Sequence, residues 1–212
     1  MRIIQVYLEK DYLYALREAI SVLSQSGVIV YPTDTLYALG GNALDHYVVD
    51  KIFRIKQRKK TKPLPVFVKN IMWAHELAHI NERNELILNK IWPGKITAVL
   101  PKKEIVPNIL TAGANTVGMR MSNFELVDRL LGKFGYPITS TAANISGEEP
   151  SLNINSIIES LRSSPVQPDL VLDIGNLSQS HPSTVLDLTT DKPKIVRVGA
   201  TTPKQLLELL EV

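Results

Sequence analysis

The sequence predicts an α/β fold in which one twisted sheet of parallel and antiparallel strands is flanked by helices. Short apolar runs, which are typical of buried strands, occur between stretches whose apolar residues recur at helical spacing. The strands and helices alternate irregularly, which favours a mixed sheet over a purely parallel one. We find no internal repeat or linker, so residues 1–212 are expected to form a single domain.

The N-terminal half is predicted to begin with a helix that follows Asp11 and ends at Gly27. Its apolar residues recur three or four positions apart, which places them on one face. A buried strand is expected at 28–31, and Pro32 ends it because proline has no N–H for the sheet ladder. The other elements expected in this half are a helix at 45–57, a strand at 64–68 and one or two helices at 70–90.

The C-terminal half is predicted to contain more strands than helices. Short apolar runs bounded by turn residues predict strands at 96–100, 117–121, 137–141, 170–172, 184–188 and 195–198. Helical spacing predicts helices at 123–134, 153–162 and 203–210. Pro203 suits the first turn of the last helix, because no N–H is needed at that position.

The polar turn at residues 32–35 is the most informative feature of the sequence. It places two hydroxyls and one carboxylate directly after a buried strand, in the order Pro32-Thr33-Asp34-Thr35. Strands of α/β proteins deliver side chains to a ligand crevice at their carboxyl ends. We therefore expect a binding site at this turn.

The positive charges are concentrated in one segment, although the formal net charge of the chain is only +3. Eight of the 24 Lys and Arg residues lie between Lys51 and Lys69, and no Asp or Glu lies among them. Such a segment attracts phosphate groups or a nucleic-acid backbone. A solvated helix face and loop is the alternative interpretation.

Several classes of protein are excluded by what the sequence lacks. The chain has no cysteine, which rules out disulfides, thiol nucleophiles and cysteine-ligated metal sites. Neither a secretory signal nor an apolar run long enough to cross a bilayer is visible, so we expect a cytoplasmic protein without membrane association. Neither a P-loop nor a G-x-G-x-x-G turn is present, so side chains must hold any nucleotide.

Residues 75–79 match the H-E-x-x-H pattern of zinc peptidases. On a helix, this spacing puts His75 and His79 on one face, with the intervening glutamate available as a general base. The pattern is short, however, and the residues that follow at 81–84 are strongly polar. Glu104 is a conceivable third ligand, but nothing around it supports that role. We therefore expect an exposed helix with two surface histidines rather than a metal site.

Cationic and hydroxyl side chains recur in segments that lie far apart in the sequence. The segments are 56–58, 62–64, 92–97, 140–147, 182–185 and 196–199, together with Arg120 at the end of a strand. Fixed Lys and Arg donors bind phosphate strongly, and Arg can do so bidentately. Small hydroxyl residues let a nucleotide approach closely. Together the segments predict an anion site that does not depend on a P-loop.

In this order, the stretches PTDTLYALG, KQR, WPGKIT, STAANISG and STVLDL resemble the motifs of the YrdC family, and the resemblance runs from about residue 12 to 200. It implies a YrdC/RibB-like fold with a large, basic concave face. Members of the family make threonylcarbamoyl-AMP from L-threonine, bicarbonate and ATP for tRNA modification, and they release pyrophosphate. The resemblance therefore implies a nucleotidyltransferase that uses ATP with Mg²⁺ and supplies a downstream tRNA threonylcarbamoyl transferase.

Carried over position by position, the resemblance also implies site residues. Threonine contacts are implied for Thr35, Arg120, Ser140 and Ser183. ATP contacts are implied for Lys56, Arg58, Lys62, Thr116, Asn144 and Arg197. Lys56 and Arg58 would act as catalytic residues by offsetting the charge on the transferring phosphorus. No metal ligand is implied among the side chains.

Several positions depart from the family pattern and bear on the efficiency of catalysis. Ala142 stands where a hydroxyl is expected to face the nucleotide, although Thr141 beside it could compensate. Phe67 replaces a polar residue of many members, and Lys62 stands where the family often has Asn. The Ala-Leu-Gly and Gly-Met-Arg stretches are also similar to the YciO branch.

The alternative is therefore a YciO-like protein that binds RNA or a nucleotide with little synthase activity. Its basic face would hold tRNA or double-stranded RNA through the phosphates. Aromatic residues make up only 6% of the chain, which argues against sequence-specific recognition of single strands.

Overall fold

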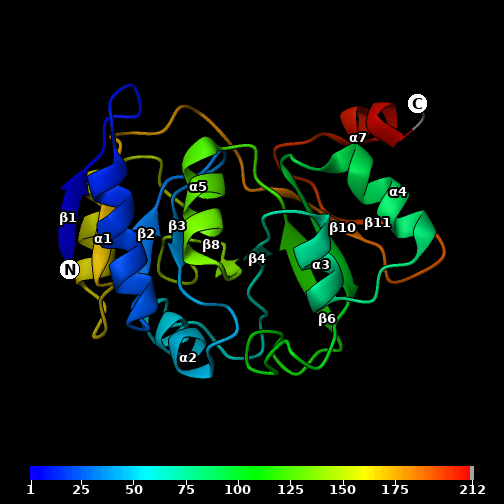
Figure 1. Cartoon of the computed structure of the whole chain (residues 1–212), viewed down its shortest axis with the longest axis horizontal. Helices are drawn as coiled ribbons and strands as arrows, with labels where there is room; N and C mark the ends of the chain where they lie inside the picture. Colours follow the sequence, from blue (N-terminus) through cyan, green and yellow to red (C-terminus); the bar gives the residue numbers. More distant parts are fainter. Residues whose placement is uncertain (211–212) are drawn as a thin grey trace.

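Two sheets and seven helices make up residues 1–210, which are the residues that the structure, a computed structural model, describes (Figure 1). Sheet A has the strand order β1 (Arg2–Gln5), β9 (Leu170–Asp173), β2 (Ile29–Tyr31), β3 (Ala38–Gly40) and β8 (Thr141–Ala142). Sheet B has the order β11 (Lys194–Arg197), β10 (Thr184–Asp187), β5 (Ile96–Pro101), β6 (Thr116–Arg120), β4 (Val66–Phe67) and β7 (Ile138–Thr139). The helices are α1 (Leu13–Ser24), α2 (His46–Ile55), α3 (Ile71–Leu77), α4 (Glu82–Ile91), α5 (Glu125–Phe134), α6 (Ile154–Arg162) and α7 (Pro203–Leu210).

Both sheets combine parallel and antiparallel pairs, as the sequence predicts. In sheet A, β9 pairs in parallel with β1 and with β2, whereas β3 runs antiparallel to β2 and to β8. In sheet B, β10 is parallel to β5 and β4 is parallel to β6, and the other three pairs are antiparallel. The predicted mixed α/β class is therefore confirmed.

Strand β2 is buried on both faces, which fixes the position of the turn that follows it. Val28 and Val30 belong to the larger hydrophobic cluster, together with residues of α2 and α6. Ile29 and Tyr31 belong to a second cluster, which includes residues of α1 and α5. Successive side chains of a strand point to opposite faces, so helices cover both sides of sheet A. The polar turn that begins at Pro32 therefore leaves a strand that packing holds on both faces.

The prediction of one sheet is wrong, because the chain passes from one sheet to the other at residues 138–142. The sequence predicts a single strand there, but β7 pairs with β4 in sheet B and β8 pairs with β3 in sheet A. Ser140 lies between them and donates its backbone N–H to the Pro65 carbonyl at 2.8 Å. The backbone N–H of Thr139 donates to the Gly41 carbonyl at 3.0 Å and so ties the sheets together. Apolar alternation does not specify which strands pair, so the sequence could not show this corner.

The predicted helices are present, and the segment 70–90 is divided into α3 and α4. The side chain of Asn70 caps α3 by accepting from the Trp73 N–H at 2.9 Å, and Asn81 caps α4 by accepting from the Asn84 N–H at 2.8 Å. Each cap satisfies an N–H group that has no partner within its helix. None of the helices within residues 1–210 has the length and apolar character needed to cross a membrane.

Candidate active site

A cavity of about 200 Å³ lies where sheets A and B meet. Its walls come from the turn after β2, the loop after α2, the carboxyl end of β6, the corner between β7 and β8, the segment before β10 and the end of β11. Its polar lining residues are Thr33, Thr35, Tyr37, Lys56, Arg58, Arg120, Ser140, Thr141, Asn144, Ser183 and Arg197. The ends of several strands therefore bring cationic and hydroxyl groups together from distant parts of the sequence.

Eight of the ten site residues expected from the sequence line this cavity, namely Thr35, Lys56, Arg58, Arg120, Ser140, Asn144, Ser183 and Arg197. Thr116 does not line it, because it begins β6 whereas the cavity lies at the other end, at Arg120. Four residues of strand separate their Cα atoms by roughly 13 Å. Lys62 does not line it either; its side chain is exposed, although its carbonyl oxygen accepts from Arg58 Nε at 3.1 Å. The expected ATP contacts of these two residues stay predictions.

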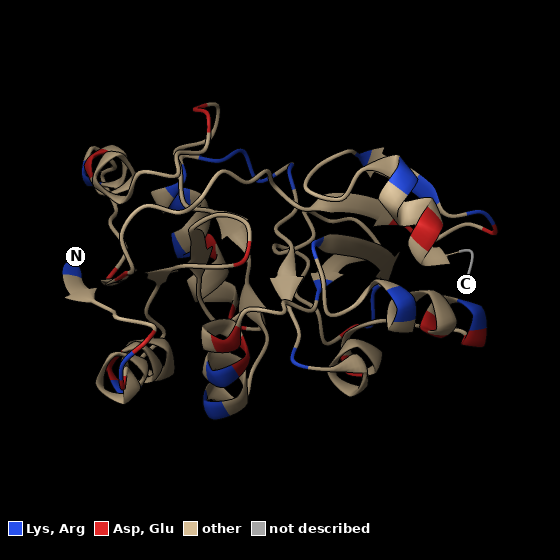
Figure 2. Cartoon of the chain, turned by 90° about the horizontal axis from the view of Figure 1, so that it is seen from above, with Lys and Arg blue, Asp and Glu red and all other residues tan. Residues whose placement is uncertain are grey.

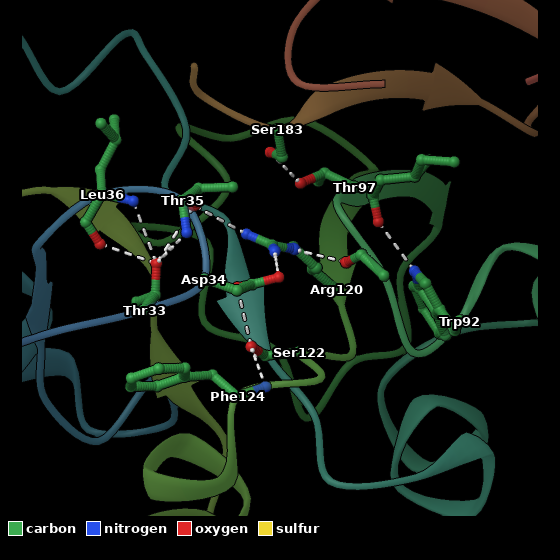
Figure 3. A network of polar contacts seen from close by, with 12 residues as sticks. Thr33, Asp34, Thr35, Leu36, Trp92, Thr97, Arg120, Ser122, Phe124 and Ser183 are labelled. Carbon is green, nitrogen blue, oxygen red and sulfur yellow. Dashed lines mark hydrogen bonds and ion pairs between the residues drawn. The ribbon is translucent and has the colours of Figure 1, made fainter. Parts of the chain in front are cut away.

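Arg120 is the centre of a buried polar network in the cavity wall (Figure 3). Its Nε donates to the Gly94 carbonyl at 2.7 Å, and its Nη1 donates to Thr35 Oγ1 at 3.0 Å. Its Nη2 forms an ion pair with Asp34, which also accepts from Ser122 Oγ at 2.9 Å. Burial lowers the pKa of Arg120, and the Asp34 carboxylate opposes that effect. The guanidinium is thus fixed in position, with its charge balanced by a carboxylate beside it.

Lys56 is buried and holds the turn at residues 142–144. Its Nζ donates to the Ala142 carbonyl, to the Asn144 carbonyl at 2.9 Å and to Asn144 Oδ1 at 2.8 Å. These three contacts match the three N–H groups of an ammonium. Burial and, to a lesser extent, the neighbouring charge of Arg58 together lower the pKa of Lys56 to about 7. Lys56 therefore positions this turn, and the contact that Ala142 makes uses its backbone rather than its side chain.

Arg58 and Arg197 are the two cationic side chains nearest to solvent in the lining of the cavity. Arg58 donates Nε and Nη2 to the carbonyls of Lys62 and Pro63, and Arg197 Nη2 donates to the Ser183 carbonyl at 2.6 Å. Burial lowers the pKa of both guanidinium groups. A guanidinium has five N–H groups, so each side chain retains donors for an anion.

Three further residues, Thr33, Asp34 and Thr97, are part of the site although no sequence motif assigns them a role there. Thr33 bonds to Thr35, Asp34 pairs with Arg120, and Thr97 Oγ1 lies 2.8 Å from Ser183 Oγ. All three belong to stretches that the sequence already singles out. Asp34 and Thr97 contact partners about 86 positions away, which only the fold reveals.

The basic segment between Lys51 and Lys69 is partly neutralised. Lys51 pairs with Asp169 at 2.6 Å, Lys60 with Asp50 at 2.5 Å and Lys69 with Asp128 at 2.8 Å. Figure 2 shows Lys and Arg spread over several segments, with Asp and Glu between them. Lys56 and Arg58 are the cationic residues of the segment that line the cavity. A basic concave face as a whole therefore stays a prediction.

The H-E-x-x-H pattern does not lie on one helix, so the expectation of a helix carrying both histidines is wrong. Helix α3 ends at Leu77 because Ala78 is extended and forms a β-bridge with Lys102. His75 Nε2 lies 3.0 Å from Glu85 Oε2, and His79 follows the bridge. Within residues 1–210, no group of three or more His, Cys, Asp or Glu is placed to hold a metal ion.

A second cavity, of about 430 Å³, is larger but lacks the site residues expected from the sequence. It is lined by residues 78–81 and 188–191, together with His75 and Arg83 among others. This cavity lies at the carboxyl ends of β5 and β10, away from the corner that joins the sheets. None of the ten expected site residues lines it. We therefore assign the site to the smaller cavity, on the convergence of side chains rather than on volume.

The side chains that line the smaller cavity are suited to holding an anion in place. Its described residues include three arginines and a lysine, several hydroxyls and one amide, and no His, Asp, Glu or Cys. Such a site lacks imidazole and carboxylate bases, and Lys56, whose pKa is lowered to about 7, is engaged by three acceptors of the protein. It offers fixed donors to a phosphate or carboxylate, which is the means by which phosphoryl-transfer enzymes stabilise developing charge.

The chain is similar in sequence to known proteins. The family model that matches residues 21–199 is that of Sua5, YciO and YrdC and is described as telomere recombination. A threonylcarbamoyl-AMP synthase of Pyrococcus abyssi is 33% identical over 187 residues, which is 88% of this chain and 54% of that protein. The chain thus spans about half the length of this relative.

Two crystal structures extend the likeness to the fold. Sua5 of P. abyssi in complex with L-threonine has a TM-score of 0.92 and 31% identity, and the match covers 99% of this chain and 61% of that one. YciO of E. coli has a TM-score of 0.84 and 28% identity, and the match covers 94% of this chain and 96% of that one.

Proposed function

Because the chain belongs to the Sua5/YciO/YrdC family, we propose that it makes L-threonylcarbamoyl-AMP from L-threonine, bicarbonate and ATP, with release of pyrophosphate. The observation that carries the proposal is the convergence of eight expected contact residues on one cavity between the two sheets. Relatives that carry this activity in their names, and the threonine complex of Sua5, support the substrate class. The product is proposed to serve the threonylcarbamoyladenosine modification of tRNA in the cytoplasm, through a downstream transferase.

The cavity is proposed to divide between the two substrates. Thr35, Arg120, Ser140 and Ser183 would bind threonine around the buried network of Arg120. Arg58, Asn144 and Arg197 would bind ATP, with Lys56 holding the turn that carries Asn144. The guanidinium groups nearest to solvent would then face the triphosphate, which is the larger and more charged ligand.

The proposed reaction has two steps. The threonine amine attacks the carbon of bicarbonate to give a carbamate, and water leaves. A carbamate oxygen then attacks the α-phosphorus of ATP, the bond to the β-phosphate oxygen breaks, and pyrophosphate leaves. Arg58 offsets charge on the transferring group through N–H groups that its backbone contacts do not use.

Mg²⁺ is proposed to arrive with ATP as part of the substrate. The described cavity lining offers no carboxylate, and Asp34 behind it is engaged by Arg120 and Ser122. Oxygen ligands from the phosphates and water are what Mg²⁺ usually binds in such sites. A resident metal held by side chains does not fit this donor set.

The competing function is a YciO-like protein that binds RNA or a nucleotide with little synthesis. It is favoured by the match to YciO, which covers nearly all of both chains. Pyrophosphate formation from ATP, measured with each amino acid in turn and bicarbonate, decides between them. Threonine-dependent release is expected. Retention of intact ATP in the presence of threonine and bicarbonate, together with binding of tRNA or double-stranded RNA, would favour the YciO-like function.

A further inference from the structure

Thr97 is a buried residue that lies behind the cavity wall rather than in it. It is 5% exposed and is not among the residues that line the cavity. It belongs to β5, which lies between β10 and β6 in sheet B. A buried hydroxyl needs a hydrogen-bond partner. Thr97 Oγ1 has one in Ser183 Oγ, which is 2.8 Å away and belongs to a residue that does line the cavity (Figure 3).

The strand on the other side of β5 fixes the orientation of the Thr97 side chain. A Cβ atom at Gly118 of β6 would lie 3.4 Å from Thr97 Cγ2, so the methyl group of Thr97 packs towards β6. The hydroxyl points towards Ser183, which directly precedes β10. Because both groups are attached to the same branched Cβ, the hydroxyl cannot turn away from Ser183 without moving the methyl group from its place beside Gly118.

The backbone around Ser183 is held by two hydrogen bonds. The Ser183 carbonyl accepts from Arg197 Nη2 at 2.6 Å, and the Thr184 N–H donates to the Lys95 carbonyl at 3.0 Å. The main freedom left to Ser183 is therefore rotation about χ1, which has three staggered positions. The bond to Thr97 selects the position in which the two hydroxyl oxygens lie 2.8 Å apart.

We propose that Thr97 is a positioning residue, which holds the Ser183 hydroxyl in the rotamer that binds L-threonine. A hydroxyl group has one proton and two lone pairs. Whichever of the two residues donates in their bond, Ser183 Oγ keeps at least one lone pair, which can accept from the ammonium or the hydroxyl group of the substrate. The inference rests on the proposed function, because that function assigns Ser183 to threonine.

The hydrogen bond from Thr97 should raise the affinity for threonine about three- to tenfold. If the three rotamers of Ser183 were equally populated, about one third of the molecules would hold the hydroxyl in the binding position. The apparent affinity falls by the fraction of molecules that can bind, which is about threefold here. The factor is larger where the binding rotamer is the least favoured of the three.

A double-mutant cycle with Ser183 tests the proposal. Thr97→Val removes the hydroxyl and keeps the shape, and calorimetric titration should show L-threonine bound about three- to tenfold more weakly. In a Ser183→Ala background the same substitution should change the affinity less than about twofold, because no hydroxyl is left to orient. Thr97→Ser keeps a hydroxyl and should bind threonine more tightly than Thr97→Val.

Thr111→Val is the matched control for the loss of a buried threonine hydroxyl. Thr111 is 1% exposed, its hydroxyl donates to the Asn108 carbonyl at 3.4 Å, and it does not line the cavity. Its substitution should leave the affinity for threonine within about twofold of wild type. Two results would overturn the proposal: an unchanged affinity in Thr97→Val, or an equal loss with and without the Ser183 hydroxyl, which would show that Thr97 acts through the fold.

A second measurement uses the unmodified protein without ligand, so it does not depend on the folding of any variant. In NMR spectra, the couplings between the Hα and the two Hβ protons of Ser183 should fit a single staggered rotamer. Intermediate couplings, which report averaging over several rotamers, would overturn the proposal. Failure of the proposed function gives a different pattern, in which wild-type protein binds no threonine although Ser183 keeps one rotamer.

Discussion

At the scale of single residues, the site consists of cationic groups that the protein holds in place with its own acceptors. Arg120 is fixed by Gly94, Thr35 and Asp34, and Lys56 by the turn at residues 142–144. Donors that are already oriented do not have to reorganise as charge develops on a transferring phosphoryl group. Both side chains are buried, and burial lowers the pKa of Arg120 and of Lys56.

Replacement of Arg58 by alanine should lower threonine-dependent pyrophosphate release at least tens-fold. Loss of one fixed donor costs about 3–4 kcal/mol at the barrier in comparable sites. The rate is measured at saturating ATP, and Lys59→Ala serves as the control because Lys59 is exposed in the same loop and does not line the cavity. Near-normal turnover in Arg58→Ala would remove this residue from the reaction.

Lys56 should make stability depend on pH above neutrality. Its pKa is about 7 in the folded chain and about 10.4 in an unfolded one, so the unfolded chain binds more protons between these values. Stability therefore rises with pH in that window, and the penalty for burying the charge is fully present below pH 7.

The difference in unfolding free energy between wild type and Lys56→Met isolates this effect. Urea unfolding at pH 7 and at pH 9 should show that the unfolding free energy of wild type increases relative to that of the variant as the pH rises. Both proteins share all other titrating groups, so their common pH dependence cancels. Parallel changes in the two proteins would contradict the lowered pKa.

The pair formed by Asp34 and Arg120 should be essential to folding. Asp34→Asn leaves a buried guanidinium without its carboxylate, which typically destabilises a protein by about 3–5 kcal/mol. Asp128→Asn is the matched control, because the pair of Asp128 with Lys69 is exposed and such pairs contribute about 0–1 kcal/mol. Chemical denaturation measures both, and equal effects of the two substitutions would count against the buried pair.

At the scale of elements, the sequence predicts the helices from their periodic apolar spacing and most strands from short apolar runs. Helix α2 buries the residues of such a stripe, and strand β5 is a nearly continuous buried run. The motifs likewise predict most of the cavity lining, because each motif ends or begins an element at the junction of the sheets. The sequence does not show which strands pair or which distant side chains meet. The corner at Ser140 and the partners of Asp34 and Lys56 are therefore known only from the fold.

The corner between β7 and β8 should depend on the backbone N–H of Ser140. Ser140→Pro removes the donor to the Pro65 carbonyl, and an unsatisfied buried acceptor costs about 1–3 kcal/mol. Ser140→Ala keeps this N–H and should lie closer to wild type in urea unfolding, while it lacks the hydroxyl proposed to contact threonine. Equal stability of the proline and alanine variants would show that this bond is dispensable.

At the scale of the whole molecule, the cavity belongs to both sheets at once. Thr35 follows a strand of sheet A, and Arg120 ends a strand of sheet B. A ligand that contacts both residues binds only the folded chain, in which the two sheets are joined. Binding must therefore stabilise the fold as a unit.

L-threonine should raise the unfolding free energy of the whole chain in a single transition. At a hundred times its dissociation constant, a ligand of the native state contributes about 2.7 kcal/mol. D-threonine is the matched control, because it has the same composition and charge but the opposite hand. Equal thermal shifts with the two enantiomers would contradict binding in a shaped cavity.

The connection at Ser140 is the shortest of those by which the chain passes between the sheets, so a rotation of sheet A against sheet B would displace this residue least. A point on the axis of a rotation keeps its place, whereas points farther from the axis sweep through an arc. Ser140 would then lie near the axis, whereas the separation would change between Thr33, which follows β2 of sheet A, and Arg197, which ends β11 of sheet B.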